Sequence, residues 1–136
     1  MNKKRVLVPI DGTERSMHSL YFIKELFPKD TTEIILMHVR EIVFFDGMAV
    51  SEEIKTAQEL GEEVLNVAEE QIREYDTRKY FTFGYAAEEI LKKASEEKID
   101  FIVMTKSTKK GLTRMIGSVT ASVVKKAHAV VMIVPE

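Results

Sequence analysis

Short apolar runs alternate along the chain with longer segments in which apolar residues recur every three or four positions. Runs rich in Val, Ile and Met predict buried parallel strands. They lie at residues 5–10, 33–39, 100–105 and 129–135, and a fifth strand is predicted at 79–84. The run at 79–84 alternates apolar and polar residues, so we expect a shorter strand nearer the edge of the sheet.

The segments between the first three strands predict two amphipathic helices. The first helix is capped by Thr13 or Ser16 and stopped by Pro28. The residues we expect on its inward side are Met17, Leu20, Tyr21 and Leu26. The second helix is long and is capped by Ser51. Its periodic apolar positions are Ile54, Ala57, Leu60, Val64, Val67, Ala68, Ile72 and Tyr75.

Two further helices are predicted at residues 86–98 and 118–127, the last with Ser118 as its N-cap. The inward residues of the helix at 86–98 are Ala87, Ile90, Leu91 and Ala94. Strands that alternate with helices indicate a parallel sheet covered by helices on both faces, the three-layer α/β class. At 136 residues we expect a single domain over residues 1–136. In such sheets ligands bind beyond the carboxyl ends of the strands, where the strand order reverses.

Composition and charge narrow the classes of function. The chain has no cysteine, which excludes disulfides and thiolate metal sites. No apolar run approaches the roughly 20 residues of a membrane span. The apolar start breaks at Pro9 and Asp11 without a cleavage signal, so we expect a cytoplasmic protein. Residues 101–135 carry six basic and no acidic side chains, which favours a local anion site over a nucleic-acid surface. For Lys125 and Lys126, we expect a solvated helix face instead.

Two predicted strand ends carry candidate chemistry. In "VPIDGT", Asp11 follows a buried strand, where a carboxylate can accept hydroxyl hydrogen bonds or help to hold a phosphate-bound metal. The alternative is that Asp11 only makes a turn or caps the first helix. In "GSVT", Gly117 and a hydroxyl group stand at a helix N-terminus, where free N–H groups favour an anion. The alternative there is an ordinary capped helix beside an exposed basic loop.

The basic loop before this helix adds positive charge from Lys106, Lys109, Lys110 and Arg114. If the strand order reverses between the first and fourth strands, both strand ends open onto one crevice. A carboxylate suited to a sugar or metal would then lie opposite donors suited to phosphate. This combination predicts a mononucleotide site.

The whole chain resembles the universal stress protein family. The segments that carry the resemblance are "VLVPIDGTERS", "ILMHV", "GYAAEEILKKA", "DFIVMT" and "GSVTASVVKKAHAVVMIVP". The resemblance implies a five-stranded parallel sheet of order 3-2-1-4-5 and a regulatory protein that binds ATP or AMP, with slow ATP hydrolysis at most. It also implies a homodimer joined by antiparallel pairing of the last strand, here Val130 to Val134.

The resemblance also assigns roles to individual residues. Asp11 is placed nearest the ribose and phosphates, and it meets a metal only through Mg²⁺ bound to the nucleotide. Val39 packs on the adenine. The remaining binding residues are Pro9 and Ile10 on the adenosine side, Met104 and Thr105 beside the base or ribose, and Thr108, Gly117, Ser118, Val119 and Thr120 at the phosphates.

The glycine loop of the chain departs from the family pattern. ATP-binding members carry Gly-x-x-Gly, nine residues, then Gly-Ser/Thr, whereas Thr105 and Thr108 stand at the first two glycines here and the spacing is one residue shorter. Threonine at positive φ costs about 1–2 kcal/mol. Two such positions predict an affinity lower by about tenfold to a hundredfold. Two functions therefore stay open: weakened nucleotide binding, or a dimeric interaction module of the same fold that needs no nucleotide.

Other features predict no chemistry of their own. The sequence has no pyrophosphate loop, Walker motif or nucleophile elbow, which disfavours nucleotide-hydrolase or transferase chemistry. His18 and His128 lack metal-ligand spacing, and we expect His38 to be a hydrogen-bonded residue near a strand end rather than a ligand. Phe44 and Phe45 are adjacent in a loop, so one should cover the crevice, the dimer seam or a partner.

Overall fold

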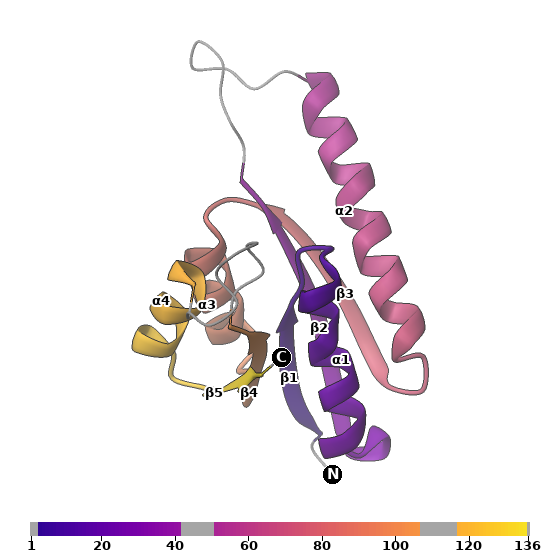
Figure 1. Cartoon of the computed structure of the whole chain (residues 1–136), viewed down its shortest axis with the longest axis vertical. Helices are drawn as coiled ribbons and strands as arrows, with labels where there is room; N and C mark the ends of the chain where they lie inside the picture. Colours follow the sequence, from indigo (N-terminus) through magenta and orange to yellow (C-terminus); the bar gives the residue numbers. More distant parts are fainter. Residues whose placement is uncertain (1–2, 42–50, 107–116, 136) are drawn as a thin grey trace.

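The computed structural model describes residues 3–41, 51–106 and 117–135 and contains one five-stranded parallel sheet (Figure 1). The strand order is β3-β2-β1-β4-β5, which confirms the prediction. The strands are β1 (Lys4–Pro9), β2 (Thr32–Arg40), β3 (Asp76–Phe83), β4 (Phe101–Thr105) and β5 (Val130–Val134).

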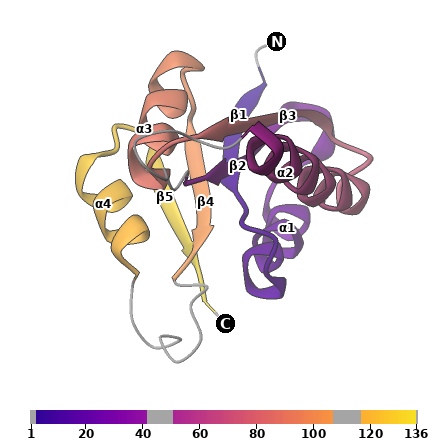
Figure 2. The same cartoon turned by 90° about the horizontal axis from the view of Figure 1, so that it is seen from above.

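Four α-helices cover the two faces of the sheet, with α1 and α2 on one side and α3 and α4 on the other (Figure 2). Their bounds are α1 (Glu14–Leu26), α2 (Ser51–Gln71), α3 (Ala86–Glu96) and α4 (Ser118–Lys126), and a short 3-10 turn, η1 (Lys29–Thr31), precedes β2. The helix α2 projects past the carboxyl end of the sheet (Figure 1). Within the described ranges, no helix is both long and apolar enough to cross a membrane.

The two faces of the sheet support two separate apolar cores. Alternate residues of β1 serve each core: Val6 and Val8 face α1 and α2, whereas Leu7 faces α3 and α4. Fully burying a side chain of this size contributes roughly 1.5–3 kcal/mol. Both faces are therefore covered, as the continuous apolar runs in the sequence predict.

The central strand β1 is bonded to β4 across a long stretch of sequence. The Arg5 N–H donates to the Asp100 carboxylate at 2.9 Å, and the Asp100 N–H donates to the Arg5 carbonyl at 2.9 Å. These residues are 95 positions apart. The pairing places the ends of β1 and β4 side by side.

Charged side chains meet where β1 and β2 begin and α3 ends. Arg78 on β3 contacts both Glu33 on β2 and Glu97 at the end of α3, each at 2.9 Å. Arg5 lies 3.5 Å from Glu33 and donates to the Glu97 carbonyl at 2.7 Å. We call Arg5, Glu33, Arg78 and Glu97 the amino-end ion cluster. It connects three strands to α3.

Most element boundaries differ from the predictions by one or two residues, and three differences matter here. The strand β3 begins at Asp76, three residues before the predicted start, and is longer than expected, although it does lie at the sheet edge. Thr13 is the N-cap of α1, as predicted. The N-cap of α4 is Gly117, and the predicted cap Ser118 is its first helical residue. The long helix ends at Gln71, before the last two apolar positions of its predicted pattern.

The inward faces of α1 and α2 were predicted only in part. In α1, Leu20 is buried, but Tyr21 and Leu26 are 61% and 50% exposed. The other buried residues of α1 are Ser16, Ser19 and Ile23. Small serine side chains at these positions allow the helix backbone to approach the sheet. In α2, Leu60 and Val67 are exposed for a similar reason, because the contact face includes Gly61.

Candidate functional site

The strand order reverses between β1 and β4, which is where the sequence predicts a crevice. These strands are neighbours, with Val6 opposite Phe101. After β1 the chain enters α1 on one face of the sheet, whereas α4, which follows β4, covers the other face (Figure 2). The two connections therefore diverge, which is the arrangement that opens a ligand crevice in α/β sheets.

The turn after β1 is held by hydrogen bonds that centre on Asp11. One carboxylate oxygen, Oδ1, accepts from the Thr13 N–H at 2.9 Å and from the Thr13 hydroxyl at 2.6 Å. The Asp11 N–H donates to the Ser16 hydroxyl at 3.2 Å, and this hydroxyl donates to the Thr13 carbonyl at 2.9 Å. The turn-forming role of Asp11 that the sequence left open is thus confirmed. Its predicted role toward a ligand remains a prediction. We call residues 9–13 the Asp11 turn.

A glycine in this turn allows close contact with α2. Gly12 has φ of 88°, a conformation that side-chain-bearing residues rarely adopt. A Cβ atom at this position would lie 3.0 Å from Cγ2 of Val64. The Asp11 turn is therefore fixed on one side by α2, and Gly12 suits both the backbone angle and the limited space.

The residue before Asp11 is tied to β2 on both sides of its peptide group. The Ile10 N–H donates to the Met37 carbonyl at 2.8 Å, and Nδ1 of His38 lies 2.7 Å from the Ile10 carbonyl. His38 is therefore hydrogen-bonded near the end of its strand, as expected. Its link to the Asp11 turn was missed, because no local sequence signal pairs residues 10 and 38.

On the β4 side, two hydrogen bonds link the strand end to the start of α4. The Thr120 hydroxyl donates to the Thr105 carbonyl at 3.0 Å, and the Gly117 N–H donates to the Lys106 carbonyl at 2.8 Å. Thr105 and Thr120 are buried, whereas Ser118 is exposed. Within the described residues, α4 has no side-chain hydrogen bond at its N-cap, which is Gly117.

The backbone strain predicted at Thr105 does not occur. Among the residues that the structure describes, Lys98 is the only non-glycine residue with positive φ. Thr105 is an ordinary strand residue because it ends β4 rather than beginning a tight loop. Thr108, at the second altered glycine, lies outside the described residues, as do Lys109, Lys110 and Arg114 of the loop.

The apolar residues assigned to the site lie on the α3 and α4 side of the sheet. Val39, Met104 and Val119 belong to the same apolar core on that side. Pro9 ends β1, and Ile10 belongs to the opposite core. Pro9, Ile10, Val39 and Met104 thus lie at or near the carboxyl ends of β1, β2 and β4, but on two faces of the sheet. Phe44 and Phe45 lie outside the described residues.

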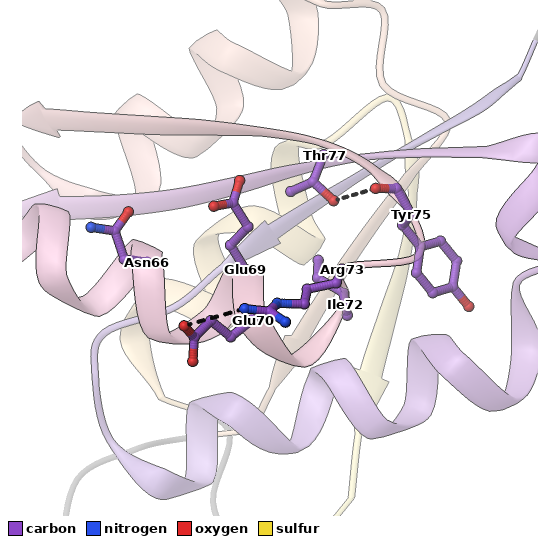
Figure 3. Close-up of a pocket in the computed structure, with 7 residues that line it drawn as sticks. All are labelled: Asn66, Glu69, Glu70, Ile72, Arg73, Tyr75 and Thr77. Atoms are coloured by element: carbon purple, nitrogen blue, oxygen red, sulfur yellow. Dashed lines mark hydrogen bonds and ion pairs between the residues drawn. The ribbon is translucent and has the colours of Figure 1, made fainter.

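A separate cavity of about 460 Å³ lies at the other end of the sheet, where α2 leads into β3 (Figure 3). Its polar groups are paired within the protein: Arg73 with Glu70 at 3.8 Å, and the Tyr75 hydroxyl with the Phe27 carbonyl at 2.6 Å. Burial, helped by Glu74, raises the pKa of the Tyr75 hydroxyl, so it stays a donor. Across the described residues, no group of three His, Asp or Glu side chains could hold a metal ion. We assign no ligand to this cavity.

The fold defines a three-layer α/β protein whose strand order reverses between β1 and β4. The sequence profile of the universal stress protein family matches residues 2–135, and the chain therefore belongs to this family.

Two curated relatives are universal stress proteins of Methanocaldococcus jannaschii. MJ0531 is 28% identical over 138 residues, which cover 96% of this chain and 81% of the relative. MJ0577 is 28% identical over 152 residues, which cover 96% of this chain and 94% of the relative. The similarity therefore spans nearly the whole chain.

Solved structures share the same architecture. A structure of MJ0577 gives a TM-score of 0.77 at 27% identity, covering 100% of this chain and 98% of that one. A universal stress protein family protein of Arabidopsis thaliana with AMP bound gives a TM-score of 0.72 at 18% identity, covering 98% of this chain and 92% of that one. A universal stress protein of Archaeoglobus fulgidus in complex with dAMP gives 0.70 at 18% identity, covering 98% of each chain. The last two establish the likeness of fold alone.

Proposed function

We propose that this universal stress protein binds an adenine nucleotide, ATP or AMP, in the crevice between β1 and β4 and acts as a cytoplasmic regulatory protein. The observation that carries the proposal is the strand order, which brings the Asp11 turn and the start of α4 to the same end of adjacent strands. Solved proteins of the same fold with AMP or dAMP bound support this choice of ligand.

Each side of the crevice suits a different part of a nucleotide. On the β1 side, the Asp11 carboxylate offers an acceptor for ribose hydroxyl groups. On the β4 side, the amides at the start of α4 and the Ser118 hydroxyl offer donors to phosphate. Val39, Met104 and Val119 supply apolar surface for the base. One carboxylate fits Mg²⁺ that is held mainly by phosphates and water.

We expect the affinity to be lower than in members that keep both glycines. Thr105 carries a branched side chain at the end of β4, where those members have hydrogen only. The backbone of Thr105 is unstrained, so we do not attribute the lower affinity to backbone strain. We attribute it to the Thr105 side chain, which keeps the backbone from approaching the phosphate closely.

Calorimetric titration tests the proposal. Protein stripped of carried-over ligand is titrated with ATP and with AMP, each with and without Mg²⁺. Binding should be measurable in the unmodified protein and weaker in Asp11→Ala. The control Asp30→Ala removes an exposed aspartate from η1, at the opposite end of the sheet, and should bind normally. Flat heats for every nucleotide would instead favour the interaction module.

We propose that the protein is not an enzyme beyond slow ATP hydrolysis. The described part of the crevice shows one carboxylate engaged in a turn and no nucleophile activated by a neighbouring base. Steady phosphate release over many turnovers that disappears in Asp11→Ala would contradict this.

We further propose that β5 pairs with its counterpart in a second copy. It is an edge strand with an apolar sequence, and its first residue Val130 is 57% exposed. The Val130 N–H donates to the Asp100 carbonyl of the β4 side, so the alternating N–H groups of Val131 and Ile133 point away from β4. These groups are available to an antiparallel partner.

Proline at an outward position tests this pairing. Val131→Pro removes one outward donor without removing a bond to β4, and should shift sedimentation from dimer to monomer. The matched control is Lys79→Pro in β3, at the other edge of the sheet. The Gly84 N–H donates to the Arg40 carbonyl of β2, and N–H groups alternate along a strand, so the N–H of residue 79 faces outward. A dimer that survives Val131→Pro would exclude pairing through β5.

A further inference from the structure

We infer that His38 is a positioning residue for the nucleotide crevice: its ring anchors the Ile10 carbonyl and so sets where the Asp11 turn stands. This inference rests on the proposed function. His38 itself would touch no nucleotide. It acts through the main chain directly before Asp11.

The hydrogen bond defines the state of the ring. Nδ1 of His38 lies 2.7 Å from the Ile10 carbonyl oxygen, and the side chain is only 7% exposed. A carbonyl oxygen can only accept, so Nδ1 must carry the hydrogen. The neutral ring is therefore held as the Nδ1–H tautomer.

This bond is the last attachment of β1 to its neighbour before the turn. The strand β1 ends at Pro9, and the Ile10 N–H still donates to the Met37 carbonyl. The next residue has left the sheet, because the Asp11 N–H donates to Ser16 of α1 instead. Consecutive residues of β2 thus hold both polar groups of the Ile10 backbone, and His38 fixes the direction in which the chain leaves the sheet.

The ring of His38 is itself held against α2. It stacks on Phe81 of β3 with centroids 5.8 Å apart, and Phe81 meets Phe83 edge-on at 5.1 Å. A Cβ atom on Gly61 would lie 2.2 Å from Phe81 and 3.1 Å from His38. Since α2 also contacts Gly12 through Val64, this helix supports the turn directly and through His38.

Two substitutions separate the hydrogen bond from the bulk of the ring. His38→Asn keeps a donor near the position of Nδ1, whereas His38→Leu fills the space without a donor. We expect His38→Leu to bind AMP about five- to tenfold more weakly, and His38→Asn to recover most of that loss. The control His128→Leu removes an exposed histidine from the opposite end of the sheet and should leave affinity unchanged.

Two measurements need no nucleotide. Nitrogen-15 spectra of the unmodified protein in alkaline buffer should show His38 as the Nδ1–H tautomer. Hydrogen exchange of the Asp11 and Thr13 amides should accelerate in His38→Leu more than in His38→Asn. An Nε2–H tautomer, or equal exchange and affinity in the two variants, would overturn the inference.

The outcomes distinguish the inference from the proposed function. If the unmodified protein binds no nucleotide, the proposed function fails and with it the role of His38 toward a ligand. If amide hydrogens of the Asp11 turn still exchange more slowly in His38→Asn than in His38→Leu, His38 anchors the turn without any role in ligand binding. If nucleotide binds well and His38→Leu binds it equally well, the proposed function stands and the inference fails.

Discussion

At the scale of single residues, Asp11 combines two tasks that a substitution can separate. Its Oδ1 atom closes the turn through Thr13, which a neutral amide oxygen can also do. Its negative charge is not needed for that bond. The charge is the property that a ribose hydroxyl or a phosphate-bound Mg²⁺ would use.

We therefore predict different results for two substitutions of Asp11. Asp11→Asn should keep the bonds to Thr13, yet lose most of the Mg²⁺-dependent part of ATP affinity. Asp11→Ala should in addition lose about 0.5–2 kcal/mol of stability, because Thr13 loses its acceptor. Thermal unfolding and calorimetry on both variants measure these effects. If Asp11→Asn and the unmodified protein bind ATP equally well with Mg²⁺ present, the charge of Asp11 plays no part in binding.

The buried hydroxyl of Thr120 provides a second prediction at this scale. Thr120→Val keeps the shape but removes the hydrogen bond to the Thr105 carbonyl, so urea unfolding should show a loss of about 1 kcal/mol. Ser95→Ala, which deletes an exposed hydroxyl from α3, should stay within about 0.5 kcal/mol. A Thr120→Val protein as stable as Ser95→Ala would show that this bond contributes nothing.

Some of these residue details follow from sequence and others do not. The Asp11–Thr13 turn and its cap are local, so hydroxyl and carboxylate spacing along four residues predicts them. The bond from His38 to Ile10 depends on the register of two strands and on where β1 stops. Such a contact, between residues 28 positions apart, leaves no periodic signal.

At the scale of elements, α2 packs closely on β3 at Gly61. Gly61 lets the helix backbone lie directly against the ring of Phe81. Leu60, which precedes Gly61, and Val67, six residues after it, both face solvent although their spacing is that of a buried stripe. The periodic pattern identifies the helix correctly, but it takes the face with large apolar side chains as the contact face. In α2 the contact face includes Gly61 instead.

Gly61→Ala tests this packing. In an open helix the change would stabilise by about 0.5–1 kcal/mol, whereas here overpacking should destabilise by about 1–3 kcal/mol. Adding Phe81→Leu should recover part of the loss, which a double-mutant cycle measures. The control Gln58→Ala lies on the exposed side of α2 and should be nearly neutral. A Gly61→Ala protein more stable than its parent would contradict the contact.

The amino-end ion cluster joins β3 and α3 and makes stability depend on pH. The hydrogen bond from Arg78, reinforced by its charge and by Lys93, lowers the pKa of the Glu97 carboxyl below its usual 4.5, against the opposing effect of burial. The contribution of Glu97 is therefore complete above that value and is lost as the pH falls through the lowered pKa. Because Arg78 is half exposed, we expect less than about 1 kcal/mol.

Urea unfolding at a series of acidic pH values measures this dependence. Glu97→Gln should be less stable than the unmodified protein at neutral pH, and the difference should shrink as the pH falls below 4.5. Glu96→Gln, one residue earlier and exposed, is the matched control. A difference that stays constant with pH would show that the charge of Glu97 is not involved.

At the scale of the whole molecule, the strand order could be predicted from alternating strands and helices together with the family resemblance. The two halves of the site come from opposite ends of the sequence, and the strand order alone brings them together. The faces on which the candidate residues lie were less predictable, because Val39 and Met104 face one core whereas Ile10 faces the other. The side that a strand-end residue faces depends on where each strand stops.

Nucleotide that bridges the two sides should stabilise the entire fold. At a ligand concentration one hundred times Kd, the expected gain is about 2.7 kcal/mol, seen as a higher thermal midpoint. Guanine nucleotides at equal concentration serve as the control for base selectivity. The measurement uses AMP and ATP at concentrations where calorimetry shows saturation. A thermal midpoint that does not move there would contradict the idea that nucleotide binds only the folded state.

The long-range bond between Arg5 and Asp100 has a consequence for synthesis on the ribosome. The strand β1, which is central in the finished sheet, is among the first segments to emerge. Its neighbour β4 emerges about 95 residues later. Until then, one side of β1 presents unpaired backbone groups, and its run of valines and leucine is incompletely covered. A nascent chain stalled before β4 should therefore recruit chaperones, and one released after β5 should not.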